Sequence, residues 1–269
     1  MRFSWQKVTQ TAQSVLFGPL LSPLRPGNVV LFHIGRSGST VLGDMLQQHT
    51  RIFWDGEIYR SILPTGAANH DPGGDPIAYV RRRMRQAGQR YYGFEVKFFH
   101  LQQLNKTLAA YVDDLERLGF DHFVILERQN YLRKIVSSLI AHETGKFHQR
   151  KAAATQAHQV TINVEQVRID RDEKPLLAFL HDYQAQFVEL ERLLQARRML
   201  KLSYEADIAA DPQLAYRKVC EFLNIATKPV DVRYVKTNPY PLPDLVANFG
   251  EVAQVLAGTP FAWMLEEER

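Results

Sequence analysis

The feature that most constrains the fold is an apolar run that leads into a glycine-rich turn and then into helical spacing. Residues 28–34 read Asn-Val-Val-Leu-Phe-His-Ile, a continuous apolar run typical of a buried parallel strand. The turn Gly35-Arg36-Ser37-Gly38 follows, and apolar residues between positions 41 and 46 then repeat with helical spacing. A strand, a tight turn and a helix in this order are the context in which a loop binds phosphate.

Strands and helices alternate along the rest of the chain. Apolar runs predict further strands at 91–99, 123–126 and 199–204. Helical stripes occupy residues 104–115, 132–140 and 176–194, and Asp211-Pro212 is typical of a helix start. We therefore expect an α/β fold, a P-loop-like three-layer sandwich whose central, mainly parallel sheet is flanked by helices.

The segments between these elements suggest one domain with a short extension. Pro26-Gly27 ends an N-terminal segment, residues 1–27, and residues 28–269 form the expected domain. Residues 64–75 are rich in Pro, Gly, Asn and Asp, which predicts a loop, and residues 76–90 predict a basic surface helix. Residues 143–172 are polar, and we expect them to form a mobile excursion from the domain. Whether this segment acts as a lid is left open.

Composition limits the partners. The net charge of +4 and the isoelectric point of about 9.1 suit a small anionic ligand but are too low to indicate nucleic acid. The one cysteine, Cys220, lies on an apolar helical face, where we expect it to be buried, and it suits a reducing compartment such as the cytoplasm. The sequence lacks clustered Cys and His residues with metal spacing, so no metal is expected.

The sequence contains no apolar stretch long enough to span a bilayer. Residues 15–21 are apolar and lie between basic regions, but Pro19 and Pro23 interrupt helical structure there. Packing of this segment on the domain is favoured, and peripheral membrane contact stays open as the alternative.

The turn has the chemistry of an anion site. Its glycines allow backbone N–H groups to point inward, Arg36 supplies charge, and Ser39 and Thr40 supply hydroxyl donors. It is not a Walker A loop, because that motif needs four residues between the glycines, followed by Lys and Ser/Thr. Hydrolysis of ATP or GTP is therefore disfavoured, and a P-loop small-molecule or nucleotide kinase is the alternative reading.

Two blocks carry a resemblance to a known family. Residues 34–42 resemble the 5'-phosphosulfate loop of sulfotransferases, especially of the carbohydrate and bacterial branches. Residues 125–137, a strand that ends in Arg128 with Ser137 about nine residues further on, are similar to the family's 3'-phosphate block. A looser likeness near residues 201–223 is read as scaffold.

The resemblance assigns donor contacts. It implies that 3'-phosphoadenosine-5'-phosphosulfate is bound without a metal. Its 5' end would contact Arg36, Ser37, Gly38, Ser39 and Thr40. Its 3'-phosphate would contact Arg128 and Ser137, with Ser138 as a neighbour that competes for the role. Lys236 lies where the family has a basic loop over the donor, and whether it reaches a phosphate is left open.

The resemblance also suggests catalytic residues. Lys97 would help at the sulfuryl oxygens, the alternative being a surface lysine at a strand end. Glu57 is the first choice for the general base, although Asp55 is close by. His100 is the second choice, because its Lys-x-x-His spacing departs from the Lys-x-His of cytosolic sulfotransferases.

The sequence thus favours a sulfotransferase that moves a sulfuryl group to an acceptor hydroxyl. The family branches favour a carbohydrate or glycolipid acceptor, and a non-enzymatic binding module is a further alternative. Phe53, Trp54 and Tyr59 lie near Glu57 and could stack on a sugar, although core packing is favoured for each. Neither the acceptor nor the oligomeric state can be read from the residues.

Overall fold

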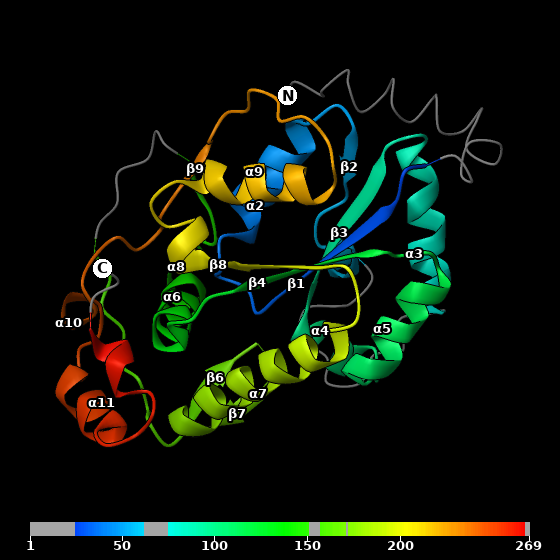
Figure 1. The fold of residues 1–269 in the computed structure, drawn as a ribbon. Coiled ribbons are helices and arrows are strands. Elements are labelled where there is room, and N and C mark those ends of the chain that lie inside the picture. Colours follow the sequence, from blue (N-terminus) through cyan, green and yellow to red (C-terminus); the bar gives the residue numbers. More distant parts are fainter. Residues whose placement is uncertain (1–24, 62–74, 151–156, 171, 267–269) are drawn as a thin grey trace.

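The computed structural model describes residues 25–61, 75–150, 157–170 and 172–266 of the chain. Its centre is a five-stranded sheet in the order β2-β3-β1-β4-β8, and every neighbouring pair is parallel (Figure 1). The strands are β1 (Asn28–His33), β2 (Ile52–Trp54), β3 (Tyr91–Lys97), β4 (His122–Glu127) and β8 (Met199–Ser203). The expected fold class, a central parallel sheet flanked by helices, is confirmed.

The helices connect the strands and cover both faces of the sheet. The longer ones are α2 (Ser39–Gln48), α3 (Pro76–Met84), α5 (Leu108–Arg117), α6 (Tyr131–Thr144), α7 (Leu176–Leu194), α9 (Pro212–Phe222) and α11 (Phe249–Leu256). Short helical segments are η2 (Ile58–Ser61), η3 (Arg85–Ala87), α4 (Phe98–Gln103), α8 (Tyr204–Asp207), α10 (Leu242–Leu245) and η4 (Ala262–Leu265). Two small antiparallel pairs join β5 (Gln149–Arg150) to β9 (Tyr234–Val235) and β6 (Val167–Ile169) to β7 (Asp172–Lys174).

Strand β1 is buried on both faces, so its alternating side chains enter two cores. Val29 and Leu31 pack into one apolar cluster, and Val30 and Phe32 pack into the other. Figure 1 shows α2 and α9 on one side of the sheet and α5, α6 and α7 on the other. The central strand therefore carries the glycine turn to the carboxyl edge of the sheet, where open α/β folds bind ligands.

Several helix starts are those that the sequence predicts. Asp211 caps α9 by accepting a hydrogen bond from the Gln213 amide at 3.0 Å, and Pro212 occupies the first turn. Thr107 caps α5 through the Ala110 amide, 3.2 Å away. Cys220 is fully buried on α9, as expected for a free cysteine in an apolar stripe.

Some boundaries differ from the sequence prediction. The strand predicted at 91–99 ends at Lys97, and α4 begins at Phe98 because the His100 ring accepts a hydrogen bond from the Lys97 amide. The helix predicted at 104–115 begins after the Thr107 cap, since Leu104 closes α4. The basic helix predicted at 76–90 ends at Met84 and continues as η3.

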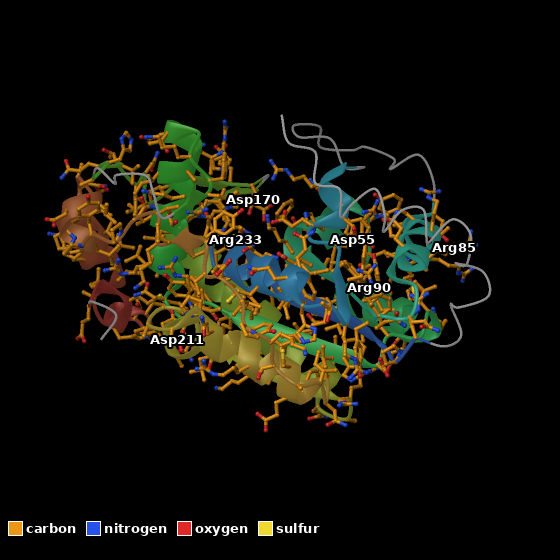
Figure 2. All side chains as sticks on the ribbon, turned by 90° about the horizontal axis from the view of Figure 1, so that it is seen from above. Asp55, Arg85, Arg90, Asp170, Asp211 and Arg233 are labelled. Atoms are coloured by element: carbon orange, nitrogen blue, oxygen red, sulfur yellow. The ribbon has the colours of Figure 1, made fainter. Side chains whose placement is uncertain are left out.

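The basic face of α3 is exposed, as expected. Arg81, Arg82 and Arg85 are exposed to solvent, and Figure 2 shows Arg85 on the side of the molecule that carries α3. Arg83 differs from them, because its guanidinium binds the Asp55 carboxylate beside the sheet. The predicted loop at 64–75 and most of the N-terminal segment lie outside the described residues, so the domain boundary at residue 28 stays a prediction.

The prediction of a mobile excursion at 143–172 is wrong for residues 160–169, whereas residues 145–148 are exposed as expected. Five apolar side chains of this stretch are buried in the core below the sheet, namely Val160, Ile162, Val164, Val167 and Ile169. The Val160 amide donates to the Leu245 carbonyl at 2.9 Å, and the Val160 carbonyl accepts from Ala247 at 2.9 Å. Residues 151–156 of the excursion lie outside the described residues. Over the parts of the chain that the structure covers, no helix is both long and apolar enough to cross a bilayer.

Candidate functional site

The turn after β1 is shaped by left-handed backbone conformations. Gly35, Arg36 and Gly38 have φ angles of +78°, +56° and +84°. A Cβ atom at Gly38 would lie 2.6 Å from Cγ2 of Ile208, so glycine is required there for space as well as for conformation. α2 begins directly after Gly38, and its free N-terminal amides and dipole make the turn suitable for an anion.

A cleft of about 1110 Å³ opens at this turn, along the carboxyl edge of the sheet. It brings together residues that the sequence analysis selected from distant parts of the chain: Arg36, Gly38, Ser39, Thr40, Glu57, Lys97, His100, Arg128, Ser137, Ser138 and Lys236. Ser37 does not line the cleft. It is buried, and its hydroxyl lies 3.4 Å from Nδ1 of His33.

Arg36 links the turn to the second sequence block. Its Nε donates to the Ser137 hydroxyl at 3.0 Å, and its Nη2 donates to the Thr237 hydroxyl at 2.6 Å. A third hydrogen bond runs from Nη1 to the Phe147 carbonyl. Burial, and after it the charge of Arg128, lower the pKa of Arg36 to about 10, so the guanidinium stays charged at neutral pH.

Arg128 extends from the end of β4 toward the same place. Its Nη1 donates to the Arg36 carbonyl at 3.0 Å, and its guanidinium carbon lies 4.5 Å from the centre of the Tyr204 ring. The ammonium of Lys236 lies over the same ring at 5.9 Å. Tyr204 therefore holds two cations beside the phosphate-binding turn.

The two serines of α6 are both buried and both line the cleft. The Ser137 hydroxyl accepts hydrogen bonds from Arg36 and, at 3.3 Å, from Nδ2 of Asn238. Ser137 is thus the serine that faces the cationic groups directly, which agrees with its selection over Ser138.

Backbone hydrogen bonds between residues 55–56 and β3 place Glu57 beside that strand. The Asp55 amide donates to the Gly93 carbonyl at 2.7 Å, and the Glu95 amide donates to the Gly56 carbonyl at 2.9 Å. Nζ of Lys97 lies 2.7 Å from Oε2 of Glu57, so the two proposed catalytic groups form an ion pair.

The structure separates Glu57 from its acidic neighbour. The Asp55 carboxylate binds the Arg83 guanidinium and accepts a hydrogen bond from the Tyr92 hydroxyl at 3.0 Å. Asp55 does not line the cleft, whereas Glu57 does. Of the two carboxylates, Glu57 alone is placed to meet a ligand in the cleft.

His100 lines the cleft but is poorly suited to accept a proton. Its Nδ1 accepts a hydrogen bond from the Lys97 amide at 3.1 Å. Burial, and after it the charge of Lys97, lower the pKa of His100 to about 3. A neutral ring with such a low pKa is a weak base compared with a carboxylate that reaches the cleft.

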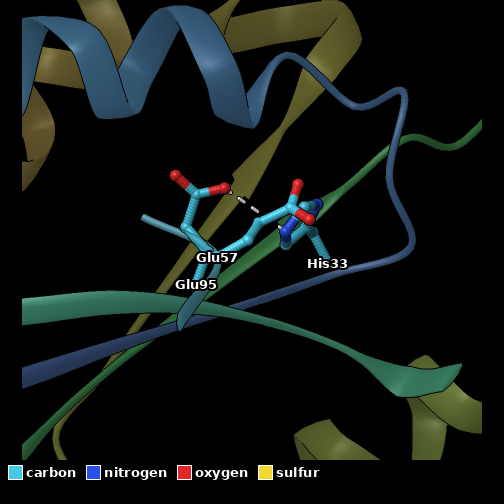
Figure 3. Close-up of side chains that lie close together, drawn as sticks. All are labelled: His33, Glu57 and Glu95. Atoms are coloured by element: carbon cyan, nitrogen blue, oxygen red, sulfur yellow. Dashed lines mark ion pairs between the residues drawn. The ribbon is translucent and has the colours of Figure 1, made fainter. Parts of the chain in front are cut away.

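A cluster of polar side chains lies behind Glu57. Figure 3 shows the side chains of Glu57, Glu95 and His33 coming together beneath α2. One ligand atom from each lies within 4.8 Å of the others, a set that could hold a divalent cation. However, Lys97 already pairs with Glu57, and the Trp54 indole donates to Glu95 at 2.9 Å. We therefore treat the group as a site of charge pairing and proton binding.

Other contributors escaped the sequence analysis. Tyr204 belongs to a stretch that the sequence assigns to scaffold, yet its ring underlies Arg128 and Lys236. Glu95 could have been found from the sequence, because it is an acidic residue inside the apolar strand Tyr91–Lys97. His148 lies 3.3 Å from the Thr40 hydroxyl, a contact across more than a hundred residues for which the sequence has no signal.

The aromatic residues considered for sugar stacking pack in or against the core instead. Tyr59 is fully buried, Trp54 is 6% exposed, and the Phe53 ring stacks on Tyr92. None of the three lines the cleft, whose aromatic lining includes Phe99 and Phe147.

Comparisons with known proteins find a likeness in fold to solved structures. Neither the scan against protein-family models nor the search of curated proteins finds a match. Among solved structures, the chain is similar to a sulfotransferase from Alicyclobacillus acidocaldarius. The identity is 16% and the TM-score 0.49, over 89% of this chain and 94% of that chain. At this level the likeness carries no weight for function, which has to be inferred from the residues of the cleft.

Proposed function

We propose that the protein is a sulfotransferase that moves a sulfuryl group from 3'-phosphoadenosine-5'-phosphosulfate to an acceptor hydroxyl. The observation that carries this proposal is the convergence of both sequence blocks in one cleft. Arg36 of the turn and Ser137 of the second block lie 3.0 Å apart, with Glu57 and Lys97 in the lining of the same cleft.

The donor half follows from the distribution of charge. The donor carries phosphate groups at two ends, and the cleft offers two groups of donors for them. The turn supplies backbone amides and the N-terminus of α2, while Arg128, Ser137 and Lys236 supply side chains nearby. These residues suit the ligand because Arg36 stays cationic at neutral pH and the Arg128 guanidinium lines the same cleft.

The reactive half would use the ion pair at the end of β3. The donor brings an activated sulfuryl group, whose transfer resembles phosphoryl transfer in needing position and charge stabilisation. Glu57 would accept the proton of the acceptor hydroxyl as the new O–S bond forms, and the electron pair of the broken S–O bond stays with the leaving nucleotide. Lys97 and Arg36 would stabilise negative charge that develops during this step.

The proposed acceptor rests on the resemblance of the turn and on the apolar lining of the cleft. A carbohydrate or glycolipid hydroxyl is favoured by the resemblance of the turn to those branches of the family. The exposed ring of Phe147 and the ring of Phe99 give the cleft apolar faces suited to a sugar ring. A reducing, cytoplasmic location is proposed from the single cysteine, and no nucleic-acid partner is proposed.

A thermal-shift experiment tests the donor half against the kinase alternative. We expect 3'-phosphoadenosine-5'-phosphate to raise the melting temperature, by an amount that grows with the logarithm of its concentration over its Kd, whereas ATP with magnesium does not. Stabilisation by ATP with magnesium alone would contradict the proposal and favour a kinase. A screen of hydroxyl acceptors with labelled donor then tests transfer, and binding without transfer to any acceptor would favour a non-enzymatic binding module.

A further inference from the structure

Strand β3 contains a buried carboxyl group to which the proposed reaction assigns no role. Glu95 is 4% exposed and lies opposite Leu31 of β1, in the middle of the sheet. Its side chain points to the face covered by α2, the same face as His33 of β1 (Figure 3). A carboxyl group at such a position has a free-energy cost unless it is neutral or well paired.

The surrounding residues fix the position of this carboxyl group. The Trp54 indole donates to Oε1 of Glu95 at 2.9 Å. A Cβ atom at Gly43 of α2 would lie 2.6 Å from that oxygen and 2.7 Å from the indole nitrogen. The absence of a side chain at Gly43 therefore leaves the space that this hydrogen-bonded pair occupies.

His33 closes the other side without supplying a charge. Its Nδ1 accepts a hydrogen bond from the Gly35 amide at 3.1 Å, so the proton of the neutral ring lies on Nε2, which faces Oε2 of Glu95 at 3.5 Å. Burial, and after it the charge of Lys97, hold the pKa of His33 well below its usual range. The ring thus presents a neutral N–H toward Glu95 without making a hydrogen bond to it.

Glu57 is the nearest acidic group to Glu95. A carboxylate oxygen of each lies within 4.8 Å of the other, and the Lys97 ammonium is bonded to Glu57. Two carboxyl groups so close together in a partly desolvated site do not readily carry two negative charges. Glu57, which is paired with the Lys97 cation, is favoured as the ionised carboxylate. Glu95, which is buried, is favoured as the protonated carboxylic acid.

We propose that Glu95 is a positioning residue for the general base, because it holds the one proton of the pair below neutral pH and leaves Glu57 ionised. This inference rests on the role of Glu57 in the proposed function. Burial, and after it the charge of Glu57, raise the pKa of Glu95 to about 7, in agreement with the geometry. Hydrogen bonds from Trp54 and Ser39 oppose this shift and are outweighed.

The pH dependence of donor binding follows from the raised pKa of Glu95. Glu95 is neutral below about pH 7 and becomes negative as the pH rises through that value. Its charge then adds to that of Glu57 and repels the anionic donor at the turn. The titratable and charged groups that act on Glu95 and His33 are Glu57, Lys97, His100 and Lys134. His148 lies within the electrostatic influence of Glu57, and Arg36 and Arg60 in turn act on His148.

Infrared spectroscopy of the ligand-free full-length protein tests the location of the proton directly. At about pH 6, wild type is expected to show the C=O band of a protonated carboxylic acid that E95Q lacks and E57Q keeps. E127Q is the matched control, because Glu127 is also buried at a strand end but is paired with Lys201 at 3.2 Å. Loss of the band in E57Q instead, or its survival in E95Q, overturns the inference.

Two measurements keep the test independent of folding and of turnover. In wild type the same band is expected to vanish as the pH rises through about 7, and a band that stays constant to about pH 9 would overturn the inference. Relative to E95Q, wild type should lose about threefold to tenfold in affinity for 3'-phosphoadenosine-5'-phosphate over that rise. Equal pH dependence in the two proteins also overturns it. Failure of this nucleotide to bind either protein at any pH counts against the proposed function, while the infrared result still decides the location of the proton.

Discussion

The cleft has two walls that are built differently. The inner wall lies at or next to the carboxyl ends of sheet strands and consists of Gly35, Arg36, Gly38–Thr40, Glu57, Lys97 and Arg128. The outer wall consists of Phe147–Gln149 and Tyr234–Asn238, which meet through the two-residue strands β5 and β9. Groups of the inner wall are buried or half-buried and anchored by the sheet, whereas Phe147, for example, is 43% exposed.

The difference in anchoring suggests different roles for the two walls. Inner-wall groups have fixed partners, such as the 2.7 Å pair of Glu57 and Lys97, so they can be positioned before a ligand arrives. Outer-wall groups reach the inner wall through single contacts, as when the Thr237 hydroxyl accepts from Arg36 at 2.6 Å. Changes in the inner wall should therefore have large effects on function or stability, and changes in the outer wall should have small ones.

The largest expected effect is on turnover in the Glu57→Gln variant. Removing a general base typically lowers the rate by about 100-fold to 10,000-fold. Binding of 3'-phosphoadenosine-5'-phosphate should not weaken, because the nucleotide contacts other groups and the charge removed is negative. Steady-state kinetics with labelled donor and calorimetry of the nucleotide check both statements. Near-normal turnover would remove Glu57 from the role.

Next in size is the stability of the Gly38→Ala variant. Alanine there adds a strained φ of +84° and a contact of 2.6 Å with Ile208, which together should cost about 2–4 kcal/mol. Gly145→Ala is the matched control, because Gly145 has a φ of +67° and, among the described residues, only its own chain neighbours come within 4 Å of where a Cβ would lie. It starts the segment that leads to the outer wall and should lose only about 1 kcal/mol. Denaturant unfolding of both variants measures the difference, and equal losses would show that the Ile208 contact is unimportant.

The Arg128→Ala variant should weaken donor binding. Loss of a charge-assisted contact to phosphate corresponds to about 10-fold to 100-fold in affinity for 3'-phosphoadenosine-5'-phosphate. Arg117→Ala removes the same charge from an exposed site on α5, where the side chain is 70% exposed, and should leave affinity nearly unchanged. Calorimetry that finds equal affinities for the two variants would contradict the 3'-phosphate assignment.

The smallest effect is expected for Lys236→Ala in the outer wall. Lys236 is exposed and lies over Tyr204 at 5.9 Å, so we expect a loss of about twofold to fivefold in nucleotide affinity that diminishes with added salt. Titrations at low and high ionic strength measure this loss. A loss as large as that of Arg128→Ala would mean that the outer wall contributes to binding as strongly as the inner wall.

The inner wall could be predicted from the sequence because its signals are local. The apolar run before Gly35, the glycines themselves and the position of Arg128 after a buried strand all lie within short stretches. Parallel strands place their carboxyl ends at one edge, so these stretches converge whenever the sheet forms. Lys97 and Glu57 were selected instead from the resemblance to a known family, and the structure places both in the lining of the same cleft.

The errors have a different origin. Val160, Ile162 and Val164 alternate as β-type apolar positions, but the many polar neighbours concealed that these side chains are buried under the sheet. Ser37 belongs to the turn by sequence, yet the local backbone directs its hydroxyl toward His33 and away from the cleft. In both cases the outcome depends on which surface packs against the segment.

The sequence by itself determined the α/β class, the glycine turn after the first strand and the residues at the ends of the central strands, since each rests on short-range pattern and on the geometry of parallel sheets. The tertiary structure alone decided that Asp55 binds Arg83 while Glu57 faces the cleft. It also decided that His100 is too well buried to be an effective base, and that Glu95 lies against His33 and Glu57. The physical reason is that burial and the approach of distant charges set protonation, and these depend on packing between segments far apart in the chain.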